Sequence, residues 1–285
     1  MLQFDQSFIA ASQFALPPFD LVRPRSLEEY TEILAAISTE PCYLAGGTDL
    51  FIQFREGLRP ELIVDINKIA ELSEISRTAE HLSIGAGVRH EIGVRHTAVK
   101  EAVSGLDVAW ALFGNVRTRA MGTLGGNLMA RRARYEGPIL ATALNAKMNF
   151  LNSSGIRTAI MQDIWDGSIA PDSLLTSVDI PLSVNPRLAY DRSLRPIMTV
   201  AAVIEDGSGG GYRGRAVVGS EWNQPVTLDL DLTGGKNLSD IAIAARDISR
   251  AAFSNFPKTV EDASYKREAG AVLLKRLLVQ LDNKP

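Results

Sequence analysis

The chain has 285 residues, 46% of them hydrophobic and 22% charged, which is ordinary for a soluble globular protein long enough for two domains. Its net charge of −3 lacks the basic excess of nucleic-acid-binding domains, and it has no apolar run of about 18 residues that would span a membrane. The N-terminus has no basic start typical of a secretory signal, so we expect a cytoplasmic location.

The first third of the chain alternates between strand and helix patterns. Residues 19–22 form a short extended run, and Ser26 opens a helix with Glu28 and Glu29 in its first turn. Three further apolar runs are predicted strands: residues 41–45, 62–66 and 82–88. This order favours a fold that mixes helices and strands.

The middle of the chain is more helical. Residues 99–112 carry small and apolar side chains at helical spacing, and residues 137–146 form a predicted helix with Pro138 near its first turn. Predicted strands follow at residues 148–151, 156–160 and 174–180. Residues 152–155 have the composition of a hairpin turn.

A boundary is predicted near residues 181–186. Beyond it, two extended runs flank the glycine cluster of residues 207–211, which we interpret as a hairpin connection because no helix follows it. The runs cover residues 196–205 and 212–219. Amphipathic helices are predicted at residues 238–253 and 265–281. The C-terminal third is therefore α+β.

The single cysteine limits the redox chemistry that this chain can carry. Cys42 cannot form an intramolecular disulfide, a CxxC pair or a four-cysteine iron–sulfur site. If the protein transfers electrons, an organic cofactor must carry them here, and any iron–sulfur centre must lie in another chain. Cys42 itself lies in an apolar run, which predicts a buried small side chain.

Two glycine-rich loops are the strongest indication of a ligand. Residues 44–50 read LAGGTDL and residues 122–128 read GTLGGNL. Paired glycines permit φ > 0 and expose backbone amides, and successive amides can form a concave anion site. Either loop alone could be a simple tight turn. The matching pair predicts two halves that close on one diphosphate-containing ligand.

Polar side chains in and near these loops suit such a ligand. Thr48 and Thr123 could each give a hydroxyl to a phosphate oxygen, while most of the binding would come from the flanking amides. Asn127 could bind through its amide or stabilise its own turn. Arg119, three residues before Gly122, could offset the diphosphate charge.

An arginine-rich segment, RRARYE, follows the second loop at residues 131–136. It fits a solvated face or a helix start, and it fits equally a basic rim that faces an anionic cofactor or a partner chain. No metal site is predicted, because His81, His90 and His96 lack a ligand spacing and are expected on the surface or in loops. GxSxG and Walker patterns do not occur, and no GxGxxG pattern is followed directly by a predicted helix.

Several longer stretches carry a family resemblance. In order they are FDLVRPRSLEEYTEIL, YLAGGTDLFIQFREGLRPELIVDINKIAELSEI, LSIGAGV, RAMGTLGGNL, GPILATALNAKMNF and ASYKREAGAVLLKRLLVQL. They span nearly the whole chain and resemble the flavin-binding (medium) subunit of the xanthine dehydrogenase / carbon monoxide dehydrogenase family of molybdenum hydroxylases.

The resemblance implies an α+β fold. A two-part FAD-binding domain of the vanillyl-alcohol oxidase/MurB type would cover residues 1–183, with its parts at roughly 1–66 and 67–183. A smaller α+β C-terminal domain would cover residues 184–285.

The resemblance also implies which residues bind FAD. The loops would hold the diphosphate through Leu44, Ala45, Gly46, Gly47, Thr48, Asp49, Leu50, Gly122, Thr123, Gly125, Gly126 and Asn127, with Arg119 nearby. Glu136 stands where the family usually has an aspartate near the adenosine half. Ile180 ends a run whose backbone would lie near the cofactor, and Arg192 stands where the family often has a lysine near the flavin.

Besides Glu136, which is one methylene longer than aspartate, the chain departs from the family pattern at two further places. Arg132-Ala133 replace a usual Ser-Pro or Asp-Pro pair, and Arg89 replaces a common threonine. These changes leave FAD binding expected but put the contacts around Glu136 in question.

The implied function is electron transfer through FAD. A large molybdopterin-binding subunit would oxidise the substrate, and a small [2Fe–2S] subunit would pass electrons to this flavin, in a dimer of heterotrimers. NAD, a quinone, oxygen or another carrier would accept them, and this chain would need no catalytic side chain or metal. Two alternatives stay open: a stand-alone FAD oxidoreductase for a small substrate, or an assembly subunit that has lost FAD.

Overall fold

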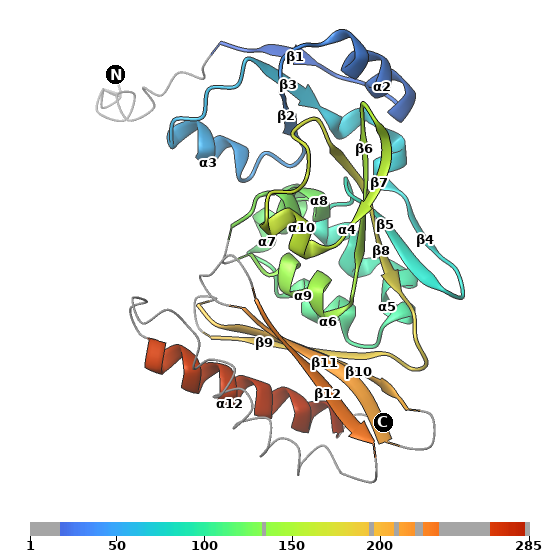
Figure 1. The fold of residues 1–285 in the computed structure, drawn as a ribbon, viewed down its shortest axis with the longest axis vertical. Helices are drawn as coiled ribbons and strands as arrows, with labels where there is room; N and C mark the ends of the chain where they lie inside the picture. Colours follow the sequence, from blue (N-terminus) through green and yellow to red (C-terminus); the bar gives the residue numbers. More distant parts are fainter. Residues whose placement is uncertain are drawn as a thin grey trace, which may run out of the picture.

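The computed structural model describes residues 18–132, 135–193, 197–207, 211–219, 225–233 and 263–282. Figure 1 shows three sheets that follow one another from the N-terminal to the C-terminal part, with helices between and beside them. This arrangement confirms the predicted α+β class. The helix predicted at residues 238–253 lies outside the described residues.

The N-terminal sheet places the first glycine loop at the end of a strand. Its parallel strands have the order β1-β3-β2. They are β1 (Asp20–Val22), β2 (Pro41–Leu44) and β3 (Leu62–Asp65). Ligands of open parallel sheets bind beyond the carboxyl ends of the strands, and the first loop directly follows the carboxyl end of β2.

Helix α2 (Leu27–Ala36) begins where the sequence predicts. The hydroxyl of Ser26 accepts the Glu29 N–H at 3.1 Å and so caps the helix. Tyr30 is buried in one apolar cluster with Val64 of β3. The apolar face of the helix therefore holds it against the sheet.

The middle sheet is antiparallel, with the order β4-β5-β8-β6-β7. Its strands are β4 (Ile75–Arg77), β5 (His81–Gly85), β6 (Lys147–Asn152), β7 (Gly155–Ala159) and β8 (Leu174–Pro181). On one face Met148, Phe150 and Val178 are buried in the main apolar cluster. On the other face Asn149 donates to Asp179 at 2.7 Å. This alternation is typical of a sheet with one covered face.

Short helices connect the strands and loops of the N-terminal and middle parts, and many of them cover the buried face of the middle sheet. They are α3 (Leu50–Arg55), η1 (Ile66–Lys68), η2 (Ala70–Ser73), α4 (His90–Arg95), α5 (Thr97–Ala102), α6 (Leu106–Ala111), α7 (Val116–Met121), α8 (Leu124–Met129), α9 (Gly137–Ala143) and α10 (Met161–Trp165). The helical pattern of residues 99–112 forms two helices, because Gly105 adopts a left-handed φ of 90° between α5 and α6.

The C-terminal sheet is also antiparallel, with the order β12-β11-β10-β9. Its strands are β9 (Arg187–Arg192), β10 (Thr199–Asp206), β11 (Gly211–Gly219) and β12 (Val226–Thr233). The pairing of β10 with β11 agrees with the predicted hairpin, although residues 208–210 lie outside the described part. The sequence analysis did not predict β9 or β12.

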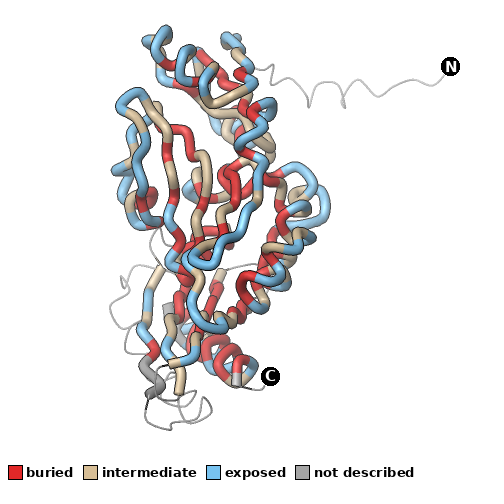
Figure 2. Tube along the Cα trace, turned by 90° about the vertical axis from the view of Figure 1, so that its right-hand side faces the viewer, coloured by how far each residue is buried: buried red, intermediate tan, exposed pale blue. Residues whose placement is uncertain are grey.

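Both faces of this sheet are covered, which explains why β10 is apolar throughout. Val200 and Ala202 pack with leucines of α12 (Ala263–Asp282), while Ala201 belongs to the cluster of the middle helices. Figure 1 shows α12 on one side of the sheet and α9 on the other, and Figure 2 shows buried positions concentrated where helices meet sheets. In a strand between two layers, successive side chains point to opposite faces of the sheet, and both faces are buried.

The predicted division near residue 183 stays a prediction. The gap between β8, which ends at Pro181, and β9, which begins at Arg187, supports it. No helix in the described part of the chain is long and apolar enough to cross a membrane.

We expect Leu278→Ala to destabilise the C-terminal sheet. Leu278 on α12 is fully buried, so its truncation leaves a cavity and should lower the free energy of unfolding by about 2–5 kcal/mol. Chemical denaturation measures this change. Lys275→Ala, at an exposed position of the same helix, is the control and should change stability little. Equal stability of the two variants would show that α12 does not pack as described.

Candidate functional site

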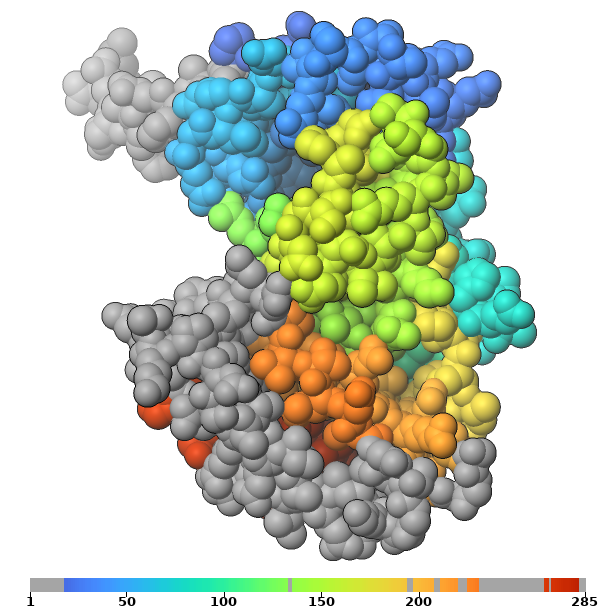
Figure 3. Space-filling model, viewed as in Figure 1, coloured from blue at the N-terminus to red at the C-terminus, as the bar shows by residue number. Residues whose placement is uncertain are grey.

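A cavity of about 580 Å³ lies where the N-terminal sheet meets the middle part of the chain. Figure 3 shows this seam between the blue N-terminal part and the green-to-yellow middle part. Most of the predicted site residues line the cavity, namely Ala45, Gly46, Gly47, Thr48, Asp49, Leu50, Gly122, Thr123, Gly125, Gly126, Asn127 and Glu136. The other predicted residues, Leu44, Arg119, Ile180 and Arg192, do not line it.

The two glycine loops touch backbone to backbone. A Cβ atom on Gly46 would lie 2.2 Å from the carbonyl oxygen of Met121 and 2.9 Å from Cα of Gly122. Any side chain at residue 46 would therefore separate the loops. The neighbouring Gly47 has a left-handed φ of 70°. The first glycine of the pair thus permits the contact, and the second permits the turn.

The second loop uses its own amides to build helix α8. The hydroxyl of Thr123 accepts the Gly126 N–H at 3.0 Å, and the Gly125 N–H donates to Ala86 O at 2.8 Å. The N–H of Asn127 donates to Thr123 O at 3.0 Å. The prediction that amides of both loops bind an anion is therefore wrong for these residues, because the helix cap and the contact with Ala86 already satisfy them.

The first loop retains more unpaired amides than the second, where the Thr123 N–H alone has no partner among the described residues. The N–H groups of residues 46–49 have no hydrogen-bond partner among the described residues. The Asn127 side chain does not stabilise its own turn, because its Oδ1 accepts the Gly137 N–H at 3.1 Å and so joins α8 to α9. Its Nδ2 has no partner in the described part of the chain. The first loop thus offers backbone donors, and the second offers side-chain donors.

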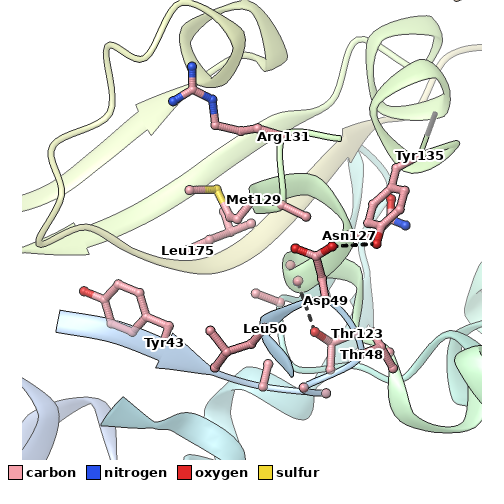
Figure 4. Close-up of a pocket in the computed structure, with 18 of the residues that line it drawn as sticks. Tyr43, Thr48, Asp49, Leu50, Thr123, Asn127, Met129, Arg131, Tyr135 and Leu175 are labelled. Carbon is pink, nitrogen blue, oxygen red and sulfur yellow. Dashed lines mark hydrogen bonds between the residues drawn. The ribbon is translucent and has the colours of Figure 1, made fainter. Parts of the chain in front are cut away.

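Asp49 ties the first loop to the arginine-rich segment. Its carboxylate accepts the Tyr135 hydroxyl at 3.0 Å and the Arg132 Nε–H at 3.1 Å, and Gln53 Nε2 donates to it at 2.5 Å. Figure 4 shows the hydrogen bond that joins Asp49 to Tyr135, both of which line the cavity. Arg132 also pairs with Glu56 at 2.8 Å. Arg132 therefore links two parts of the site, and its charge is already balanced.

The other arginines of the segment differ from Arg132. Arg131 lines the cavity, and its Nη2 donates to the Trp165 carbonyl at 3.1 Å. Its backbone is left-handed, with φ of 53°. Ala133 and Arg134 lie outside the described residues. Of the predicted basic rim, only Arg131 faces the cavity among the residues that the structure describes.

A second link between the loops was missed in the sequence analysis. The Arg89 guanidinium donates to the carbonyl of Met121 and to Asn67 Oδ1 at 2.6 Å. Asn67 Nδ2 in turn donates to the Ala45 carbonyl at 2.9 Å. Arg89, one of the departures from the family pattern, thus connects both loops. The sequence carries no signal for this link beyond the substitution itself.

Glu136 and Arg192 form a partly buried ion pair beside the cavity. Arg192 Nη1 lies 3.3 Å from Glu136 Oε1, and the Glu136 side chain is 7% exposed. Burial raises the pKa of this carboxyl, and Arg192 opposes the shift. The pair joins α9 to β9. Arg192 also donates to the Leu112 carbonyl at 3.1 Å.

Arg119 faces away from the cavity. Its Nε lies 3.6 Å from Glu91 Oε2, and its Nη1 donates to the Phe113 carbonyl at 3.0 Å. Cys42, predicted to be buried, is half-buried instead and lines the cavity. Burial raises the pKa of its thiol.

His90 is buried, so the prediction that it lies on the surface or in a loop is wrong. The residue is 2% exposed, and Trp110 Nε1 donates to its Nδ1 at 2.9 Å. Burial is the main cause that lowers the pKa of His90 to about 4, and the positive charge of the nearby Arg119 lowers it further. The ring is therefore neutral at pH 7, with its proton on Nε2. No group of metal-ligating side chains occurs among the described residues.

Comparison with known proteins identifies the family. Residues 17–183 match the model of the FAD binding domain in molybdopterin dehydrogenase. The chain belongs to this family. The match includes both glycine loops and every residue that lines the cavity.

Two relatives of this family member are named as a chain and a subunit of dehydrogenases. The chain is 30% identical over 185 residues to the glyceraldehyde dehydrogenase medium chain of Sulfolobus acidocaldarius, a match that covers 63% of this chain and 65% of that one. It is 32% identical over 171 residues to the caffeine dehydrogenase subunit beta of a Pseudomonas species, covering 58% of each. These matches thus span less than two thirds of the relatives' length.

Solved structures extend the similarity over nearly the whole fold. A chain of quinoline 2-oxidoreductase from Pseudomonas putida 86 has a TM-score of 0.82 at 24% identity, with 93% of this chain and 97% of that one covered. A chain of the Cu,Mo-CO dehydrogenase has a TM-score of 0.78 at 22% identity, with 93% and 98% covered. This FAD-binding family member therefore shares their fold, including the C-terminal sheet.

We expect Gly46→Ala to abolish FAD retention. The added methyl group would displace the Met121 carbonyl, separate the loops and remove their joint site. Flavin per chain after purification measures the effect. Gly57→Ala is the control, since a Cβ there meets nothing within 4 Å and only its positive φ of 106° opposes the substitution. A Gly46→Ala protein with as much flavin as the control would contradict the backbone contact.

The buried His90 should make stability depend on acid pH. The pKa of His90 is near 6.5 in the unfolded chain and about 4 in the folded chain. As the pH falls from 7 to 5, the unfolded chain therefore gains a proton at His90 that the folded chain does not gain. Between pH 7 and pH 5 the wild type should lose about 2 kcal/mol of unfolding free energy relative to His90→Leu. Chemical denaturation without cofactor at both pH values measures the difference. An equal loss in both proteins would show that His90 titrates normally.

Proposed function

We propose that this chain is the FAD-carrying electron-transfer subunit of a molybdenum hydroxylase. It would accept electrons from a [2Fe–2S] subunit and pass them to NAD, a quinone, oxygen or another acceptor. One observation carries the proposal: in a member of an FAD-binding family, two glycine loops meet over one cavity large enough for part of a dinucleotide. The names of relatives as medium chains and subunits support it.

The residues that line the cavity fit FAD in their chemistry. The unpaired amides of residues 46–49, the Thr123 hydroxyl and the Asn127 Nδ2 are donors suited to a diphosphate. Apolar side chains suited to a ring system line the rest of the cavity, among them Met129, Ile164 and Leu175. Bound FAD supplies the electron-accepting chemistry, and this chain positions it and sets its surroundings.

The remaining redox centres would belong to partner subunits. The chain has one cysteine, and the described residues hold no cluster of metal ligands. A large molybdopterin-binding subunit and a small [2Fe–2S] subunit would therefore complete the enzyme, as a dimer of heterotrimers in the cytoplasm. We propose the same division of this chain at residue 183, which is also where the family match ends.

The arginine-rich segment does not favour loss of FAD. Arg132 is held by Asp49 and Glu56 and does not line the cavity, so this residue of the departure leaves room for a cofactor. Its position supports FAD binding over the assembly-subunit alternative. No observation specifically favours the stand-alone oxidoreductase.

Purification with the natural partners tests the proposal. We expect the spectrum of oxidised flavin, about one FAD per chain, and flavin reduction by substrate only when the partner subunits are present. A complex without flavin would contradict FAD binding. Substrate turnover by the isolated chain would contradict the electron-transfer role and support a stand-alone enzyme.

Thr123→Val should weaken FAD binding. The valine removes a hydroxyl that faces the cavity and caps α8, so both a ligand donor and the loop geometry are lost. We expect the dissociation constant of FAD to rise about tenfold or more, measured by flavin fluorescence on adding FAD to the apo protein. Thr123→Ser keeps the hydroxyl and is the matched control. Equal weakening by both substitutions would argue against a role for the hydroxyl.

A further inference from the structure

His90 presents one unused hydrogen-bond donor to the cavity. The residue is 2% exposed and lines the cavity, so the little surface that it has lies there. Trp110 Nε1 donates a hydrogen bond to its Nδ1 at 2.9 Å. The Nε2–H has no partner among the described residues. Buried imidazole nitrogens are normally hydrogen-bonded, so this donor calls for a ligand or a water.

The open Nε2 edge lies beside the contact of the two glycine loops. A Cβ on Gly122 would lie 3.4 Å from His90 Nε2 and 3.2 Å from its Cδ2. Gly122 and Met121 are also the two residues that a Cβ on Gly46 would meet first. The Nε2–H is therefore placed where both loops converge, together with the free amides of residues 46–49.

The ring has little freedom to turn away. Trp110 and Phe113 pack edge-on against it, with ring centroids at 6.0 Å and 5.6 Å. The main-chain N–H of His90 donates to the Gly122 carbonyl at 3.1 Å, which fixes its backbone to the second loop. The Trp110 Nε1–H also fixes the tautomer, because it can donate only to an unprotonated Nδ1. A side chain held in this way is preorganised to donate.

We propose that His90 is a cofactor-binding residue whose Nε2–H donates a hydrogen bond to a diphosphate oxygen of FAD. The proposal rests on the FAD site proposed above. Trp110 acts as a positioning residue, since it holds the donor nitrogen toward the cavity. Because the ring stays neutral, it binds the anion as a dipole and not as a charge. The nearby Arg119 faces Glu91 and adds no direct contact.

Substitutions that keep or remove the donor test this role. His90→Leu removes both nitrogens, whereas His90→Gln places an amide N–H close to the position of Nε2. The 285-residue apo chains are titrated with FAD, and the 31P NMR signals of bound FAD are recorded. His81→Leu, at a position that does not line the cavity, is the control.

We expect His90→Leu to raise the dissociation constant of FAD about tenfold or more and to shift the diphosphate signals. His90→Gln should bind within about threefold of the wild type, and His81→Leu should be unchanged. His90→Leu binding within twofold of the wild type, with unchanged 31P signals, would overturn the proposal while FAD binding by the chain stands. If the wild type itself binds no FAD, the proposed function fails as well.

A measurement on the wild type keeps the test independent of folding in the variants. The Nε2–H proton of His90, identified by its loss in His90→Gln, should move downfield in 1H–15N NMR when FAD binds, as a donor to an anionic oxygen does. FAD binding without a change in this signal would overturn the proposal.

Discussion

The contact between Gly46 and the Met121–Gly122 backbone is the constraint on which the site depends. It brings the end of a parallel strand against a loop of the middle part of the chain, at a distance that no side chain permits. The Asp49 and Arg89 networks hold the same junction from two sides. The loops meet through backbone, and charged side chains keep them together.

This junction divides the ligand-binding work between the loops. The first loop keeps the amides of residues 46–49 free, while most amides of the second loop form hydrogen bonds that cap α8 or anchor it to residues 86 and 88. The second loop offers Thr123, Asn127 and the adjacent His90 instead. Most of these donors are uncharged, and Arg132 is neutralised within the protein. Oriented dipoles would thus contribute most of the donors to an anionic group, and Arg131 is the cation of the arginine-rich segment that lines the described part of the cavity.

Local patterns predicted much of the fold and part of the site. Ser26 capped a helix, apolar runs became β2 and β3, and the paired glycines marked the cavity, because each depends on residues close in sequence. The Arg89 link and the buried state of His90 could not be predicted, since each depends on partners about 20 to 30 residues away. The second-loop amides were misassigned because the same glycines serve a helix cap.

The central claim is that both loops close on the diphosphate of one FAD. A crystal structure of the FAD-loaded protein tests it most directly. We expect diphosphate oxygens within hydrogen-bond distance of the amides of residues 46–49 and of the Thr123 hydroxyl. FAD bound elsewhere, or with its diphosphate away from the Gly46–Gly122 contact, would contradict it.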